Sequence, residues 1–131
     1  MANGEFPACP KVHIGFVDVR DVAKAHISAI SDSKTDGQRI ILSSAEENMV
    51  DIGKTLYNLG YSKAPRKVMP NFLVKIASIF KGELAGTIPL LGRLNNYNKT
   101  QMKKYFKWNF ITVKHSIDDT AKQLKEMGKI K

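Results

Sequence analysis

The stretch that most constrains the fold covers residues 15–26, GFVDVRDVAKAH, where an apolar, strand-like start leads directly into a helical pattern. Val22 and Ile30 lie on one face at helical spacing, which predicts a helix over about Asp21–Ser31. The residues just before it, His13–Val17, predict a short strand. The stretch is therefore a strand-to-helix junction, and its charged residues are either catalytic or structural.

The charged residues of this junction favour the structural interpretation. Asp21 stands at the predicted helix start, where a carboxylate accepts hydrogen bonds from free first-turn amides and complements the helix dipole. Asp18 and Arg20 alternate with valines, so they share one side of an extended segment and pair with each other or with another part of the molecule. Nothing nearby indicates a displaced pKa for either carboxylate, as acid–base catalysis requires. His26 is interpreted as a core or boundary residue.

The clearest strand signal is Gln38–Leu42 (QRIIL), an apolar run after a polar turn over Asp32–Gly37. Ser44 and Glu47 then have the spacing of a capping box, which predicts that a helix begins there. Gly60 is expected to end that helix. Its apolar face consists of Met49, Ile52, Leu56 and Leu59.

The remaining residues predict mostly helices and loops. In order, we expect a loop or edge strand over Ser62–Met69, a helix over Asn71–Ala85, an irregular segment over Gly86–Tyr97, a short helix capped by Asn98, a strand over Lys107–Ile111, and a closing helix from a capping box at Ser116. The helix after Pro70 is apolar over a wide arc, so it is either well buried or a partner surface. That arc consists of Phe72, Leu73, Ile76, Ala77, Ile79, Phe80 and Leu84. The fold class is α/β, rich in helix.

Composition narrows the class of protein. A chain of 131 residues suits one domain, and no apolar run approaches the length of a membrane span. Cys9 is the only cysteine, which fits a reducing compartment, and we expect a cytoplasmic location. The net charge of +9 lies in the second part of the chain, with −2 over residues 1–50 and +11 over residues 51–131.

Several kinds of chemistry lack their motif in this chain. Cys9 and His13 are separated by a proline-containing extended stretch, so their spacing predicts no metal site. Neither G-x-G-x-x-G nor G-x-x-x-x-G-K-[ST] occurs, so no phosphate-binding glycine loop is encoded. None of the four tyrosines is followed by lysine at the fourth position. The residues alone therefore predict no catalytic group and no metal.

The motifs resemble one known family. Residues 15–26 resemble the F-V-x-V-x-D-V-A-x-A-H junction of the extended short-chain dehydrogenases/reductases, and most closely the group with dihydroflavonol 4-reductase and cinnamoyl-CoA reductase. Residues 37–44 resemble the G-x-R-Y-I-L strand that follows it. Residues 106–108 and 116–121 resemble the closing region of the family. The motifs occur in the family's order, so the resemblance covers nearly the whole chain.

The resemblance implies only part of such an enzyme. Relatives carry a Rossmann domain with a glycine-rich loop, a catalytic Ser or Thr, and Tyr-x-x-x-Lys, none of which occurs here. The chain then corresponds to the C-terminal, substrate-side portion of an NAD(P)(H)-dependent carbonyl reductase that lacks its cofactor-binding core and is inactive alone. It divides into an extended pocket-side segment (1–12), a strand–helix–strand unit (13–43) and a helical subdomain (44–131).

The resemblance also implies partners and a pocket wall. The parent enzyme would bind NADP or NAD and a small carbonyl substrate, whereas this chain alone would bind no cofactor. The expected pocket-wall residues are Phe6, Pro7, Val12, Ile14 and Phe16. Asp18 stands where many relatives have His, and Gly15 where plant flavonoid reductases carry a polar residue, so a flavonoid substrate is not implied. The strand over Gln38–Leu42 would lack its neighbours, so the partner is the missing Rossmann portion or a second copy.

A binding module is the alternative interpretation. A small basic helical domain could use residues 51–131 on nucleic acid or on an anionic membrane. Base-reading modules cluster arginines or interleave aromatics on one face, and this chain has four arginines, none adjacent to another. The nearest approach is the stretch from Tyr97 to Trp108, with its interleaved lysines. Nucleic acid is therefore the less favoured partner.

Overall fold

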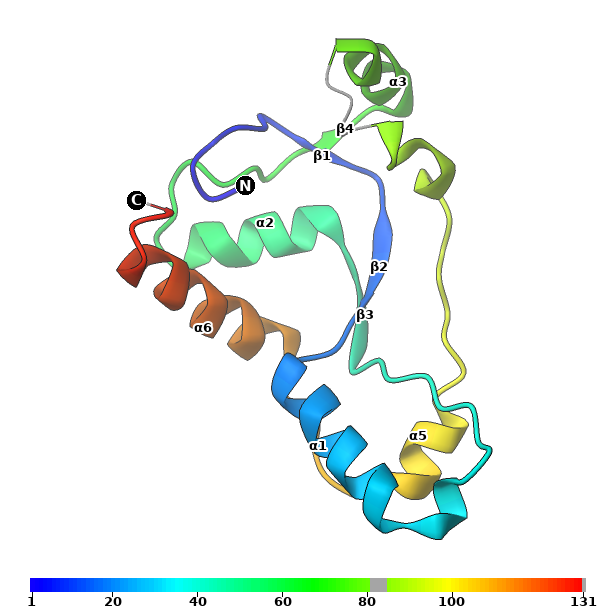
Figure 1. The fold of residues 1–131 in the computed structure, drawn as a ribbon. Helices are drawn as coiled ribbons and strands as arrows, with labels where there is room; N and C mark the ends of the chain where they lie inside the picture. Colours follow the sequence, from blue (N-terminus) through cyan, green and yellow to red (C-terminus); the bar gives the residue numbers. More distant parts are fainter. Residues whose placement is uncertain (81–84, 131) are drawn as a thin grey trace.

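The computed structural model describes residues 1–80 and 85–130, and Figure 1 shows two helical regions joined by a narrow β-ribbon. In chain order the elements are β1 (Cys9–Pro10), β2 (His13–Phe16), α1 (Val19–Ser31), a 3₁₀ turn (Ser33–Thr35), β3 (Ala45–Asn48), α2 (Met49–Asn58), β4 (Val68–Met69), α3 (Asn71–Phe80), a second 3₁₀ turn (Ile88–Leu90), α5 (Thr100–Tyr105) and α6 (Val113–Glu126). In Figure 1, α2 and α6 lie beside the two chain ends, while α1 and α5 form the opposite end.

The ribbon pairs β2 with β3 in antiparallel register, with His13 opposite Asn48 and Phe16 opposite Ala45. The predicted strand at His13 is confirmed. The predicted strand over Gln38–Leu42 is wrong, because that segment is not part of a ladder. A strand is defined by its partner, and among the described residues β2 pairs with β3, which begins shortly after Leu42. A second short pairing joins β1 and β4 in parallel.

The predicted capping box at Ser44 is also wrong. Its hydroxyl donates to the Phe16 carbonyl at 3.0 Å, and its backbone amide donates to the same oxygen at 2.7 Å. Ser44 thus continues the β2–β3 ladder, and the helix begins later, at Met49. Where α2 ends, Gly60 adopts a φ of +99°, a conformation that favours glycine, so the predicted stop is confirmed.

Helix α1 begins before the predicted position. Asp18 is its N-cap residue, with an extended backbone, and its Oδ1 accepts a hydrogen bond from the Arg20 amide at 2.8 Å. The expectation that Asp21 caps this helix is therefore wrong. Both carboxylates could serve as a cap, and the choice falls on the residue that still has strand-like φ and ψ angles.

The C-terminal part shows similar shifts. Helix α6 begins at Val113 with Thr112 as its cap, so the predicted capping box at Ser116 is wrong. The predicted strand over Lys107–Ile111 is not observed, because the Ile111 amide bonds to a side chain instead of a neighbouring strand. Helices α3, after Pro70, and α5 are confirmed. The predicted extension of α3 to Ala85 crosses positions 81–84, including Leu84, which lie outside the described residues.

Two small apolar cores stabilise the two ends of the molecule. One is built on Ala25, Met102 and Phe106, so it joins α1 to α5. The other is built on Leu56, Ala64 and Ala121, so it joins α2 to α6. The apolar segment after the first 3₁₀ turn contributes Ile40 and Leu42 to the first core without forming a strand. Within residues 1–80 and 85–130, no helix is long and apolar enough to cross a membrane.

Candidate functional site

The N-terminus of α1 carries an ion pair between a buried carboxylate and a half-exposed guanidinium. Asp18 is 4% exposed, and its two carboxylate oxygens accept hydrogen bonds from Nε and Nη2 of Arg20, each at 2.8 Å. This bidentate geometry is among the stronger hydrogen-bonded arrangements in proteins. The Arg20 hydrogen bonds, above all, hold the pKa of Asp18 well below its usual range, and a hydrogen bond involving Ser116 adds to the effect.

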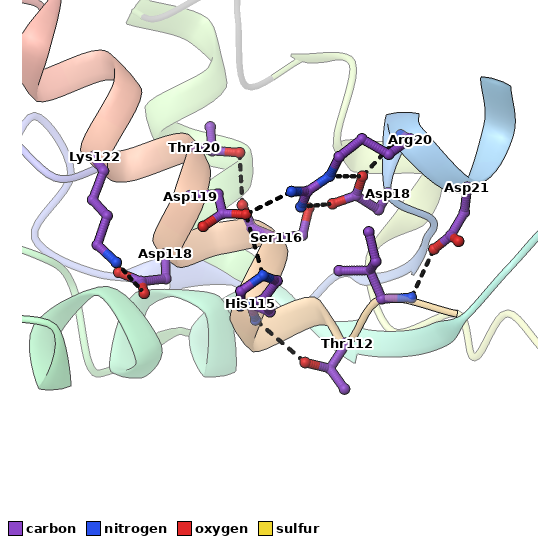
Figure 2. A network of polar contacts seen from close by, with 11 residues as sticks. Asp18, Arg20, Asp21, Thr112, His115, Ser116, Asp118, Asp119, Thr120 and Lys122 are labelled. Atoms are coloured by element: carbon purple, nitrogen blue, oxygen red, sulfur yellow. Dashed lines mark hydrogen bonds and ion pairs between the residues drawn. The ribbon is translucent and has the colours of Figure 1, made fainter. Parts of the chain in front are cut away.

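Arg20 joins this pair to the closing helix. Figure 2 shows its guanidinium between Asp18 and Asp119 of α6, with Nη1 at 2.8 Å from Asp119 Oδ2. His115 Nε2 lies 3.4 Å from the same oxygen. The two carboxylates around Arg20 raise its pKa above the ordinary value, so it stays charged. The network therefore connects residues 18–20 with the first half of α6.

Asp21 makes a separate contact with a distant segment. Its Oδ2 accepts a hydrogen bond from the Ile111 amide at 2.7 Å, and its Oδ1 accepts one from the Trp108 indole at 3.2 Å. Asp21 is 4% exposed, so both bonds lie in the interior. The carboxylate thus fixes the segment that links α5 to α6, a role that the sequence interpretation missed. The partners are about 90 residues away, so nothing in the local pattern indicates them.

These contacts decide what the junction can do chemically. Every oxygen of Asp18 and Asp21 accepts at least one hydrogen bond from the protein, and the lowered pKa of Asp18 keeps it from carrying a proton near neutral pH. A general acid or base needs a pKa near the operating pH. The junction residues therefore position helices. The expectation that His26 is a core or boundary residue is wrong, because its side chain is exposed. Its Nδ1 lies 2.8 Å from the Val22 carbonyl, and it takes no part in either network.

A cavity of about 330 Å³ lies next to this junction, between α2 and α6. Phe16, Asp18 and Ser116 line one end of it. Most of its wall is aliphatic, from Ile52, Leu56, Ile117, Ala121 and Leu124. The arrangement is that of a ligand pocket, with apolar walls and a few polar groups.

The five expected pocket-wall residues do not converge on one site. Phe16 lines the cavity between α2 and α6, whereas Phe6 lines a smaller one with Cys9 and Met49. Pro7 lies in a shallow surface depression beside residues 62–67. Val12 is 1% exposed and lies in the interior. Ile14 lies in β2 opposite Glu47 and lines none of these cavities.

A second polar cluster on the ribbon was not expected from the sequence. Lys99 Nζ lies 2.8 Å from Glu46 Oε2, and the buried Ser43 hydroxyl donates to the other oxygen at 3.2 Å. The Lys99 hydrogen bond is the main reason that the pKa of Glu46 is lowered. Nearby, Asn95 Nδ2 donates to the His13 carbonyl at 2.8 Å.

A close approach across the ribbon requires a glycine. An ideal Cβ on Gly15 would come within 2.4 Å of the Tyr97 ring. The segment around residues 92–99 therefore lies directly against β2, also through a bond from the Gly92 amide to the Lys11 carbonyl at 2.9 Å. The aromatic face of Tyr97 is thus used inside the protein.

The cofactor and metal chemistry of the described residues is limited. In that part of the chain, no three His, Cys, Asp or Glu side chains are grouped closely enough to hold a metal ion. A dinucleotide pyrophosphate binds at a helix N-terminus with free amides. At the α1 N-terminus, which follows a strand as in such sites, the Asp18 carboxylate already accepts the Arg20 amide bond. This first-turn amide is therefore not free, and the turn does not fit a dinucleotide pyrophosphate.

We compared the chain with known proteins by sequence and by structure. No family model matches the chain. It is 32% identical over 127 residues to the NADPH-dependent methylglyoxal reductase Gre2 of Saccharomyces cerevisiae, in a match that covers 92% of this chain and 32% of the yeast protein. The chain thus spans about a third of the length of this curated relative.

Solved structures agree with the sequence match. The yeast methylglyoxal/isovaleraldehyde reductase Gre2, solved with NADPH, superposes with a TM-score of 0.67 at 30% identity, over 96% of this chain and 37% of that one. This chain is therefore similar, in both sequence and fold, to part of an NADPH-dependent reductase. The crystal structure of gox2253 matches with a TM-score of 0.73 at 18% identity, over 99% of this chain and 42% of that one, and shows the same fold. The resemblance drawn from the junction motif is confirmed.

Proposed function

We propose that this chain is the substrate-side portion of an NADPH-dependent carbonyl reductase and contributes pocket wall rather than catalytic groups. The joint match in sequence and structure to the yeast reductase carries the proposal. That protein is NADPH-dependent by name, which supports NADP rather than NAD in the whole enzyme. The substrate would be a small aldehyde or ketone.

The side chains in this chain suggest which steps of the reaction it would serve. In such an enzyme the bound nicotinamide supplies the hydride, and a Tyr/Lys pair outside this chain supplies the proton. The junction carboxylates hold helices, as their hydrogen bonds indicate. The residues that remain for substrate contact are apolar. Among the expected wall residues, Phe16 has the strongest support, because it lines the apolar cavity that adjoins the junction.

The uncovered apolar surface supports a missing partner. Helix α3 exposes Phe72, Ile76 and Ile79. Surfaces of this kind are typically covered by another protein surface. In our proposal the cofactor-binding portion covers them, and in its absence the chain associates with itself.

A chimera tests the proposal directly. The matched segment of the yeast reductase is replaced by this chain, and NADPH oxidation is followed with methylglyoxal and isovaleraldehyde. We expect saturable carbonyl reduction by the chimera and none by this chain alone with NADPH or NADH. A chimera that folds and binds NADPH but reduces no carbonyl would contradict the pocket-wall role. Saturable activity that follows the isolated chain through purification would contradict its dependence on another portion.

Two variants of the chimera separate the wall from the surface. Phe16→Ala should lower kcat/KM about tenfold, equal to about 1.4 kcal/mol of transition-state binding. Leu94→Ala should leave it unchanged, because Leu94 is among the most exposed apolar residues of the described chain. Equal effects of the two substitutions would remove Phe16 from the wall.

The nucleic-acid alternative gains no support from the structure. The Trp108 indole donates to Asp21 and its ring packs between Phe106 and Phe110, so it is not free to stack on a base. Lys99 pairs with Glu46. Lys99 and Trp108 of this stretch therefore contact the protein itself.

A further inference from the structure

The cavity between α2 and α6 is a candidate binding site in its own right. Its walls come from two helices that pack around Ala121, and Phe16 closes one end. Its volume of about 330 Å³ lies at the lower end of the range of ligand pockets, about 300–1,000 Å³. A site of this size accommodates one small molecule.

The polar groups that line this cavity are already satisfied by the protein. The Thr120 hydroxyl donates to the Ser116 carbonyl at 2.7 Å, and the Ser44 hydroxyl donates to the Phe16 carbonyl at 3.0 Å. The Asp18 carboxylate is paired with Arg20. A buried water needs two to four polar partners, and these groups offer it little. An apolar molecule would displace poorly held water, which is favourable.

Charge complementarity selects the same class of ligand. Asp18 is the only ionisable side chain among the residues that line the cavity in the described part of the chain, and Arg20 neutralises it. The N-terminal ammonium of Met1, which also lines the cavity, is paired with Glu5 at 3.1 Å. An anion would therefore meet no unpaired cation, and a cation would meet no unpaired carboxylate.

We propose that the cavity between α2 and α6 binds a neutral, apolar small molecule, with a branched aliphatic group or aromatic ring against Ile52, Leu56 and Ile117. Phe16 also belongs to the wall in the function proposed above, but this site can be tested separately, because all the lining residues named here belong to this chain. Binding requires no cofactor and no second portion of an enzyme.

A neutral fluorescent probe tests the site on the chain as it is. The protein is titrated with N-phenyl-1-naphthylamine, and the emission of the probe is measured. A second titration uses a naphthalene sulfonate as the charged control. We expect one saturable site for the neutral probe, with a Kd of about 10 μM, near −7 kcal/mol. We expect at least tenfold weaker binding of the sulfonate. Equal binding of the two probes, or no saturable binding of either, would overturn the proposal.

Matched variants locate the probe. Leu124→Trp fills the cavity from its partly exposed rim, and Ile117→Trp fills it from the middle of α6. Each should weaken probe binding at least tenfold. Ile79→Ser removes an exposed apolar side chain from α3 and should leave binding unchanged. If Leu124→Trp binds the probe as the parent does, or if Ile79→Ser abolishes binding, the site is elsewhere. If this chain binds no probe but the chimera reduces carbonyls, the present proposal fails and the proposed function stands. If this chain binds the probe but a folded chimera reduces no carbonyl, the proposed function fails and the present proposal stands.

Discussion

The contacts that join the start of α1 to α6 and the segment before it contrast with helix α3 in how their side chains are buried and paired. The junction buries two carboxylates, yet each finds all its partners within the chain, some of them about 90 residues away. Helix α3 is far more apolar, but among its residues 71–79, whose burial the structure describes, only Val74 is fully buried, while Ile79 remains 79% exposed. The two buried carboxylates thus find their partners inside the protein, whereas the apolar surface of α3 remains exposed.

The contrast separates stability from association. Buried charged groups are costly unless paired, so a junction of this kind destabilises the fold strongly when one partner is removed. An exposed apolar side chain contributes little to the stability of the monomer but drives contact with other surfaces. Substitutions in the two regions should therefore change different measurements.

The largest effect is expected for Asp21→Ala. It leaves the Ile111 amide and the Trp108 indole without their acceptor in the interior, which should lower the free energy of unfolding by about 3 kcal/mol. Urea unfolding followed by the emission of Trp108, the single tryptophan, measures it. Glu126→Ala, at an exposed position, is the control and should stay within about 0.5 kcal/mol. Equal shifts for both would refute the interior role of Asp21.

Asp18→Ala should lower the free energy of unfolding less, by about 2 kcal/mol. The substitution removes the helix cap and the ion pair with Arg20, but the half-exposed guanidinium can bind water instead. The same urea experiment measures it. If Asp18→Ala proved more destabilising than Asp21→Ala, the half-exposed ion pair would be the stronger of the two connections.

The pH dependence of stability should follow from the same pair. Because the pKa of Asp18 is lower in the folded chain than in the unfolded one, its contribution is complete above the unfolded value of about 4 and is lost as the pH falls below it. Melting temperatures between pH 7 and pH 2 should fall less steeply for Asp18→Asn than for the parent chain. Parallel curves would show that the carboxylate is not held in its charged form.

The smallest change in stability is expected on α3. Ile79→Ser combined with Phe72→Ser should alter the free energy of unfolding by less than about 0.5 kcal/mol, since both side chains are largely exposed. Light scattering over a concentration series should nevertheless show that self-association decreases. A strictly monomeric parent chain at about 100 μM would contradict the expectation that this surface seeks a partner.

Local periodicity predicted the helices better than the strands. The apolar spacing that ends at Gly60 gave α2, and the pattern around Met102 gave α5. The strand expected at Gln38–Leu42 failed because apolar runs show burial but not pairing, and these residues pack against α1 and α5 instead. Two capping boxes failed because Ser44 joins the ribbon and Thr112 caps α6 earlier.

The candidate site was harder to predict, since it depends on long-range contacts. The pairing of Asp18 with Arg20 is local, and the alternation of residues 17–20 allowed it. The Asp21 contacts and the Lys99–Glu46 pair join residues that are far apart in sequence, and no spacing rule describes them. The cavity forms only when α2 and α6 pack together. The sequence therefore predicted one lining residue, Phe16, but not the lining residues on the two helices.

The 90-residue separation between Asp21 and Ile111 also has a consequence for synthesis on the ribosome. At about 5–20 residues per second, roughly 5–18 s pass between translation of the first and the second. During that interval the helix that contains Asp21 is held by local contacts alone, and its carboxylate faces solvent or other proteins. The nascent chain therefore gains this stabilising contact only after the segment that contains Ile111 has been made, and in that interval the buried carboxylate lacks its partner.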